Sequence, residues 1–234
     1  MTSRIGTLGE KSLHAALKAW YAQPGDWLEW RVEGRYIVDI YRPPTDTATG
    51  QYVEIQTHRP GKLKPKLVFL LERGPVRLVY PIAQERTIVR LDADGEILSR
   101  RKSPKHGTVF HLFPEMVSLP ALVIHPNFVL DVPLIREEQF WLDDGQGSWR
   151  RKHWSLYDRQ LVDVCDVVSL ATPDDFAALL PRQLPGVFDT QELAQALDLP
   201  RSLAQKMTYC LHKMAVLEIT GRRSHAKLYR RTSW

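Results

Sequence analysis

Two strand-like runs, residues 36–41 and 52–57, each carry a single carboxylate among apolar, β-branched and aromatic neighbours. Asp39 and Glu54 are both flanked on each side by valine or isoleucine. A charged group in such a run is costly unless it is paired or binds a cation. Two carboxylates on adjacent strands that converge on one point form a hard-cation site suited to magnesium. That is the chemistry of phosphodiester cleavage.

The surrounding elements place these two runs in an α/β context. Apolar periodicity and turn residues predict a helix, three strands, a second helix and a fourth strand, at residues 8–22, 27–33, 35–42, 51–57, 62–73 and 76–82. A helix that joins the third strand to the fourth predicts that these two strands are parallel neighbours through a right-handed crossover. The expected core is therefore an α-β-β-β-α-β unit with a mixed sheet.

Over roughly residues 5–92 this unit resembles the PD-(D/E)xK nuclease superfamily, the restriction-endonuclease-like or Holliday-junction-resolvase-like core. The family pattern is a glutamate on the first helix, an aspartate on one strand and Glu-x-Lys on the next, which fall here on Glu10, Asp39 and Glu54. The resemblance implies Mg²⁺ or Mn²⁺, with Asp39 and Glu54 as ligands and Glu10 as support. Val38 departs from the family where proline is frequent, and Gln56 departs where lysine orients or activates the attacking water.

Gln56 can hydrogen-bond a water molecule but carries no charge. Side chains alternate along a strand, so Glu54 and Gln56 are expected on one face. Lys62 and Lys66 lie four residues apart on the following helix and are expected to contact a phosphate, or to replace the missing lysine in space. His14, one turn after Glu10, is a further candidate. The alternative for Asp39 and Glu54 is a pair of edge charges in a solvated hairpin.

The middle of the chain matches no known pattern. Residues 99–107 are predicted to form a basic loop, and its Arg100, Arg101 and Lys102 suit phosphate contact, although a solvated loop is the alternative. A short helix is predicted within residues 110–119, a strand over 128–140 and a polar loop or linker over 143–160.

The C-terminal part carries the charge. Residues 181–234 hold nine Lys or Arg and four acidic residues, a net of +5 that equals the net charge of the whole chain. A helix from Asp189, a second helix over 201–214 and a basic hairpin with its tip at 221–225 predict a winged helix-turn-helix. Its expected DNA contacts are Arg201, Gln205, Lys206, Arg222 and Arg223. Winged helices also mediate protein contacts, and that alternative stays open.

Composition sets the broad class. The chain has 234 residues, of which 44% are hydrophobic and 25% charged, as in ordinary globular proteins. Its two cysteines, Cys165 and Cys210, show no CxxC spacing, so they predict neither a zinc site nor a disulfide framework. No secretion signal or membrane-span pattern occurs in the sequence, and a cytoplasmic location is expected.

The whole pattern predicts a nuclease-like α/β part over residues 1–172 and a winged-helix DNA-binding part over 173–234. The expected function is a magnesium-dependent DNA endonuclease, with Asp39 and Glu54 on the metal and Gln56 orienting the water. Many nucleases of this kind pair to cut both strands, so a homodimer is a further expectation. The alternatives are a catalytically inactive nuclease-fold DNA-binding protein or regulator, and a subunit of a DNA repair or defence complex.

Overall fold

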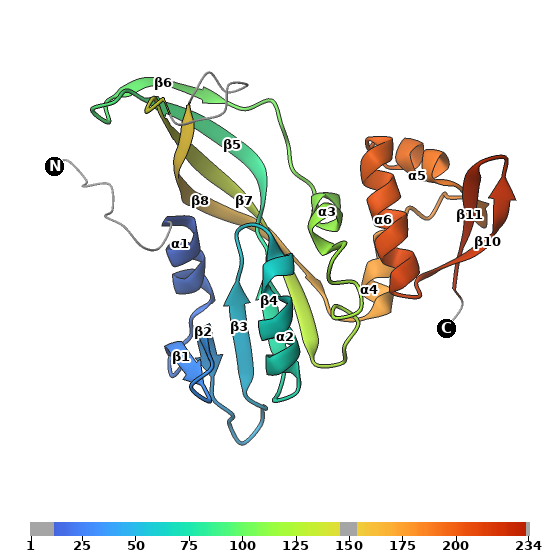
Figure 1. Cartoon of the computed structure of the whole chain (residues 1–234), viewed down its shortest axis with the longest axis horizontal. Coiled ribbons are helices and arrows are strands. Elements are labelled where there is room, and N and C mark those ends of the chain that lie inside the picture. The colour runs from blue at the N-terminus through green and yellow to red at the C-terminus, as the bar shows by residue number, and fades with distance from the viewer. Residues whose placement is uncertain (1–11, 146–153, 233–234) are drawn as a thin grey trace.

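A computed structural model describes residues 12–145 and 154–232 (Figure 1). An eight-stranded mixed sheet forms its larger part, and a three-stranded antiparallel sheet with helices forms its C-terminal part. The elements of the larger part are α1 (Ser12–Tyr21), β1 (Trp27–Val32), β2 (Tyr36–Arg42), β3 (Gln51–Ile55), η1 (Pro60–Leu63), α2 (Lys64–Leu71), β4 (Val76–Val79), β5 (Ile82–Leu91), β6 (Ile97–Lys102), η2 (Val109–Leu112), α3 (Phe113–Met116), β7 (Phe128–Leu142) and β8 (Ser155–Leu170).

The predicted α-β-β-β-α-β order is confirmed. The strand order is β1-β2-β3-β4-β7-β5-β6, and β8 pairs with β7. β3 and β4 are parallel, with Glu54 opposite Leu78, as the crossover helix between them predicts. Pro65 lies in the first turn of α2, where the missing N–H has no intrahelical partner to lose.

β7 joins two halves of the sheet. Its first residues pair with β4, its later residues pair with β5, and β8 runs antiparallel along its length. β5, β6, residues 134–142 of β7 and residues 155–166 of β8 form a long arm, seen at the upper left of Figure 1, and α1 packs against the β8 part of it. We call this part of the sheet the arm.

Two sequence predictions for the arm were wrong. Residues 97–102 form β6, where a loop over 99–107 was predicted, because the backbone pairs with β5 along its length. The repulsion within this basic run is relieved by acids on β7 and β5, since Arg100 pairs with Glu138 and Lys102 with Glu85. Residues 155–160 belong to β8, where a loop or linker over 143–160 was predicted, and residues 146–153 lie outside the described ranges.

The sheet has a hydrophobic core on each face. Leu13 and Leu17 of α1 pack on one face, against Val53 and Ile55 of β3. α2 and α3 cover the other face, whose core includes Leu78. Within the described ranges, no helix has the length and apolar content needed to cross a bilayer.

The C-terminal part follows the order α4 (Pro173–Ala178), β9 (Val187–Phe188), α5 (Thr190–Ala196), α6 (Arg201–Lys213), β10 (Leu217–Arg223) and β11 (Ala226–Arg231). The predicted helix start at Asp189 is confirmed. Its carboxylate accepts from the N–H groups of Gln191 and Glu192 at 2.8 and 2.9 Å, and Glu192 accepts in return from the Asp189 N–H. α4 and β9 were not predicted.

The C-terminal helices share a core with the larger part. Met207 and Cys210 on the buried face of α6 belong to the same apolar cluster as Phe113 and Met116 of α3. The Cys210 thiol lies 3.7 Å from the Phe113 carbonyl oxygen. Figure 1 accordingly shows α6 beside α3, on the side of the molecule opposite α1.

Candidate functional site

Asp39 lies where β2 and β3 separate. The backbone pairing of these strands runs from Arg42 opposite Gln51 to Ile40 opposite Val53. Beyond that point a side chain replaces the backbone acceptor: Asp39 Oδ2 accepts a hydrogen bond from the Ile55 N–H at 2.7 Å. A carboxylate in this position both satisfies a buried donor and holds the two strands apart at the site.

The backbone of β1 and β2 is irregular next to Asp39. Glu29 of β1 falls opposite Asp39 between two regular pairs, and its φ of 50° is left-handed. Val38 and Ile40 are two residues apart, yet they pack in the cores on opposite faces of the sheet. A regular strand would place them on one face, so β2 changes orientation at Asp39.

Glu54 is the most buried group of the site. Its side chain is 6% exposed, and its Oε1 lies 2.5 Å from the Nζ of Lys66 on α2. Within the described ranges, Glu54 Oε2 is a buried oxygen that has no hydrogen-bond partner. Burial and then the negative charge of Asp39 raise the pKa of Glu54 to about 7, although the Lys66 ammonium acts in the opposite direction.

His14 approaches the site from α1. Its Nε2 lies 3.3 Å from Asp39 Oδ1. Burial acts to raise the pKa of Asp39, but hydrogen bonds from His14 and from the Ile55 N–H outweigh it and hold that pKa below its ordinary value. Two carboxylates on adjacent strands therefore have pKa values shifted in opposite directions, which is typical of functional sites.

The remaining candidates of this region fall in different places. Lys66 lies in the site and pairs with Glu54. This position agrees with the prediction that a lysine of the following helix replaces, in space, the lysine that the Glu-x-Lys motif lacks here. Gln56 lies just beyond β3, and its amide donates to the His58 carbonyl oxygen. Lys62 is exposed in η1. Glu10 lies outside the described residues.

Two other buried carboxylates show what a structural pairing looks like in this protein. Both oxygens of Asp131 have partners, Arg77 at 2.6 Å and Ser169 at 2.5 Å. Both oxygens of Glu137 also have partners, and two of these are Arg86 and Arg159. Asp131 stands in an apolar strand just as Asp39 does, so the sequence signal that found Asp39 also applied to it. Only the contacts distinguish a saturated carboxylate from Glu54, whose Oε2 has no partner in the part of the chain that the structure describes.

The predicted basic contacts of β6 divide between two faces of the arm. Arg100 and Lys102 pair with acids, whereas Arg101 lines a hollow with Trp141 and Trp154. The sequence reasoning passed over these two tryptophans.

The predicted contacts of the C-terminal part are exposed. Arg201, Gln205 and Lys206 lie on the outer face of α6, opposite its buried residues. Arg222 is exposed near the end of β10, whereas Arg223 lies 3.0 Å from Glu192 of α5. This surface thus presents polar and basic groups from a helix and a hairpin.

Residues 11–171 match the family described as "Domain of unknown function (DUF8091)". The chain belongs to this family. The matched region contains Asp39, Glu54 and Lys66 and ends directly after β8. A protein of Treponema pallidum (strain Nichols), described as "Uncharacterized protein", is 31% identical over 233 residues, which cover 97% of this chain and 87% of that protein. No solved structure gives a significant match to the chain. The DUF8091 region thus contains the whole described part of the candidate site.

Proposed function

We propose that this protein is a metal-dependent DNA endonuclease of the PD-(D/E)xK type, delivered to DNA by a C-terminal winged helix. One observation carries the proposal. Glu54 is buried beside Asp39, with Lys66 on one oxygen and no partner for the second oxygen among residues 12–145 and 154–232. A buried carboxylate oxygen without a donor is costly, and a cation removes that cost.

The residues suit a magnesium ion. Oxygen donors from two carboxylates match the preference of a hard cation. Asp39 and Glu54 would hold the ion, and the repulsion that raises the pKa of Glu54 would become an attraction for it. No group of three His, Cys, Asp or Glu side chains suited to a metal occurs within the described ranges, so water, substrate oxygens or Glu10 would complete the coordination. When bound, the ion supplies Lewis-acid activation of a phosphoryl oxygen and acidifies a water molecule.

The chain's own residues supply the rest of the mechanism. Lys66 places a positive charge beside Glu54 and stabilises negative charge that develops on a phosphate. In the family this role belongs to the lysine of the Glu-x-Lys motif. This chain has Gln56 at that motif position, and the Lys66 ammonium would take over the role. His14 holds the Asp39 carboxylate in its charged form. Gln56 is proposed to turn from the His58 carbonyl to orient the attacking water.

The C-terminal part supports delivery to DNA. Its order α4-β9-α5-α6-β10-β11 is compatible with a winged helix, in which α6 would be the recognition helix and the β10–β11 hairpin the wing. Arg201, Gln205 and Lys206 are residue types that contact phosphates and base edges. Lys213 of α6 and Lys64 of α2 line one shared hollow. Contacts made by α6 would therefore continue toward the helix that carries Lys66.

A second candidate function rests on the same ion pair. Lys66 neutralises Glu54 without any metal, so the site is also compatible with a nuclease fold that binds DNA and does not cut it. The two candidates differ in one property: the endonuclease binds a divalent cation at Asp39 and Glu54, and the binding protein does not.

Cleavage and metal binding test the proposal together. Plasmid, linear, branched and single-stranded DNA are incubated with Mg²⁺ or Mn²⁺ and the wild type, Asp39→Asn, Glu54→Gln or Lys66→Ala. Lys62→Ala, an exposed lysine four residues away, is the control for Lys66. Asp163→Asn, an exposed β8 carboxylate paired with Arg136, is the control for the acids. Mn²⁺ binding to each protein is measured by electron paramagnetic resonance.

We expect cutting and Mn²⁺ binding by the wild type and both controls. Loss of cutting in all three site variants, with loss of Mn²⁺ binding in the two acid variants, is the expected pattern. DNA binding without cutting or Mn²⁺ binding by the wild type would replace the endonuclease with the second candidate. Equal cutting by the wild type and both acid variants would refute the site.

A further inference from the structure

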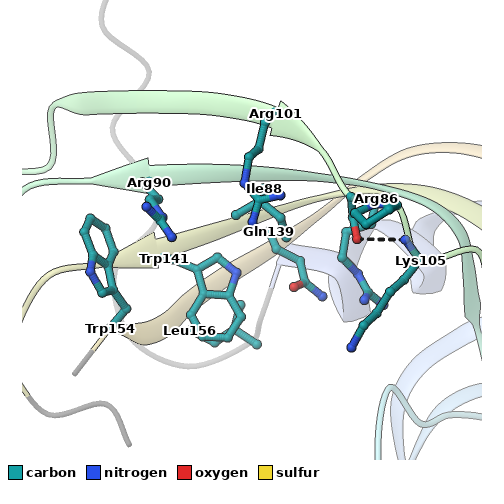
Figure 2. Close-up of a pocket in the computed structure, with 11 residues that line it drawn as sticks. Arg86, Ile88, Arg90, Arg101, Lys105, Gln139, Trp141, Trp154 and Leu156 are labelled. Carbon is teal, nitrogen blue, oxygen red and sulfur yellow. Dashed lines mark hydrogen bonds between the residues drawn. The ribbon is translucent and has the colours of Figure 1, made fainter. Parts of the chain in front are cut away.

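The arm carries a basic, tryptophan-lined hollow that the proposed chemistry does not use. Its volume is about 530 Å³, and side chains from β5, β6, β7 and the start of β8 line it. Figure 2 shows Trp154, Arg90, Trp141, Gln139 and Lys105 following one another along it. We call it the arm pocket. A hollow of this size holds a small organic group such as a nucleotide.

The arm pocket is positively charged and lacks acids. Arg90, Arg101 and Lys105 line it, and among the described residues no carboxylate pairs with their side chains. The described residues that line it include no aspartate or glutamate. By contrast, Arg100 and Lys102 each pair with a glutamate. These two cations flank Arg101 on β6. Unneutralised cations gathered around one hollow favour an anionic ligand.

The pocket also presents flat aromatic surfaces. The indoles of Trp141 and Trp154 both line it, and the Arg90 guanidinium lies 5.1 Å from the centre of the Trp154 ring. Indole rings beside guanidinium groups bind planar rings by stacking. A ligand that suits this pocket has a planar ring and a negative charge.

A second hollow of about 350 Å³ continues the arm pocket toward the candidate active site. The two hollows share Arg86, Lys105 and Gln139, and the second is also lined by Thr57. Among the described residues, no aspartate or glutamate lines the second hollow either. Arg159 contributes to its wall and donates to the carbonyl oxygen of Thr57 at 3.1 Å. Thr57 lies three residues after Glu54 in the chain. A basic path therefore leads from the two tryptophans to the loop that follows β3.

Glu137 makes this path rigid. Its buried carboxylate accepts from Arg86 at 2.8 Å and from Arg159 at 2.9 and 2.6 Å. Gln139, which also lines both hollows, donates to the same carboxylate at 2.8 Å. One buried acid thus holds three lining residues in place, and an ordered wall loses less conformational entropy when a ligand binds.

We infer that the arm pocket binds an unpaired nucleotide of single-stranded DNA, its base stacked on Trp154 and Trp141 and its phosphates on Arg90 and Arg101. This inference rests on the proposed function for the choice of DNA as the polyanion, and it makes a substrate with an unpaired segment the preferred one. A base inside a duplex does not expose its face, so blunt duplex DNA does not use the pocket.

Binding without metal tests the inference separately from cleavage. Fluorescence anisotropy in EDTA measures the affinity for oligothymidylate of about 15 nucleotides, for an abasic strand of the same length and for a blunt duplex. The variants are Trp154→Ala, Trp154→Phe and Arg101→Ala. Arg100→Ala is the matched control, since Arg100 is the neighbour of Arg101 on β6 and pairs with Glu138.

We expect Trp154→Ala to weaken oligothymidylate binding about five- to one-hundred-fold, as loss of one stacking residue does. Its affinity for the abasic strand and the duplex should stay unchanged, and Trp154→Phe should restore most of the loss. Arg101→Ala should weaken binding of both single strands and reduce the salt slope by about one, whereas Arg100→Ala should do neither.

Equal wild-type affinity for oligothymidylate and for the abasic strand would overturn the inference, because no base would then be bound. Equal weakening of all three DNAs by Trp154→Ala would also overturn it, as a general structural effect. Asp39→Asn keeps the two proposals apart: it should abolish cleavage and leave oligothymidylate binding intact. If the wild type cuts DNA and Trp154→Ala has no effect on binding, the endonuclease stands and the arm pocket does not.

Discussion

Glu54→Gln should make the metal-free protein more stable at alkaline pH, although it removes an ion pair with Lys66. Burial and the charge of Asp39 raise the pKa of Glu54 to about 7, from an ordinary value of 4.5. The folded state therefore holds this proton more tightly than the unfolded state. A group of this kind contributes stability that is present below pH 4.5 and is lost as the pH rises through about 7.

The size of the effect follows from the same shift. The difference between about 7 and 4.5 corresponds to about 3 kcal/mol of unfolding free energy. Glutamine carries no charge, so Glu54→Gln avoids this loss. At about pH 8.5 the variant should exceed the wild type by up to about 3 kcal/mol, or about 6–12 °C in Tm for a chain of this size. At about pH 4 the two should agree to within a few tenths of a kcal/mol, because Glu54 is then largely protonated in both the folded and the unfolded wild type.

Thermal unfolding in EDTA, followed by circular dichroism across this pH range, measures the difference. A variant less stable than the wild type at alkaline pH would refute the reasoning, since the Lys66 ion pair would then outweigh desolvation and repulsion. Magnesium supplies a second readout. At about ten times its Kd it should stabilise the wild type by about 1.4 kcal/mol and leave Glu54→Gln unchanged.

Three further predictions concern other residues. Lys66→Ala should lower the rate of cleavage about 10²- to 10³-fold, measured on the DNA cut best by the wild type, whereas Lys62→Ala should change it little. Met207→Ala should cost about 2–5 kcal/mol in urea unfolding, because Met207 is fully buried in the core shared by α6 and α3. Arg201→Ala should reduce the salt slope of duplex binding by about one, and Arg230→Ala, whose guanidinium pairs with Glu218, should reduce it less. An unchanged slope for Arg201→Ala would remove α6 from the DNA interface.

Local patterns determined most of the elements. The helix periodicity of α1 and α6, the apolar runs of β2, β3 and β4 and the capping box at Asp189 all depend on residues close together in the chain. The parallel pairing of β3 and β4 also followed, because a short helical crossover leaves few alternatives. These features needed no knowledge of distant partners.

Long-range pairing decided the rest of the fold. Residues 99–107 were predicted to form a basic loop, yet residues 97–102 form a strand because β5 pairs with them and glutamates on β5 and β7 pair with Lys102 and Arg100. β8 begins at Ser155 for a similar reason, since its partner is β7. A strand made of polar residues lacks the alternation of apolar side chains that predicts a strand from sequence. Its strand conformation depends on pairing partners elsewhere in the chain.

Part of the candidate site followed from the sequence, and part of it depended on the tertiary structure. The sequence by itself placed Asp39 and Glu54 on adjacent strands, because a carboxylate within an apolar run marks a group that needs a partner. Only the tertiary structure decided which partners they have. Arg77 and Ser169 pair with Asp131, and Arg86 and Arg159 pair with Glu137. Lys66 of α2 reaches one oxygen of Glu54, and no group within the described ranges pairs with the other oxygen. The tertiary structure also gathered Arg90, Arg101, Trp141 and Trp154 into one pocket. The physical reason is that the charge state and reactivity of a buried group depend on atoms within a few ångströms in space, and sheet pairing brings those atoms from distant parts of the chain.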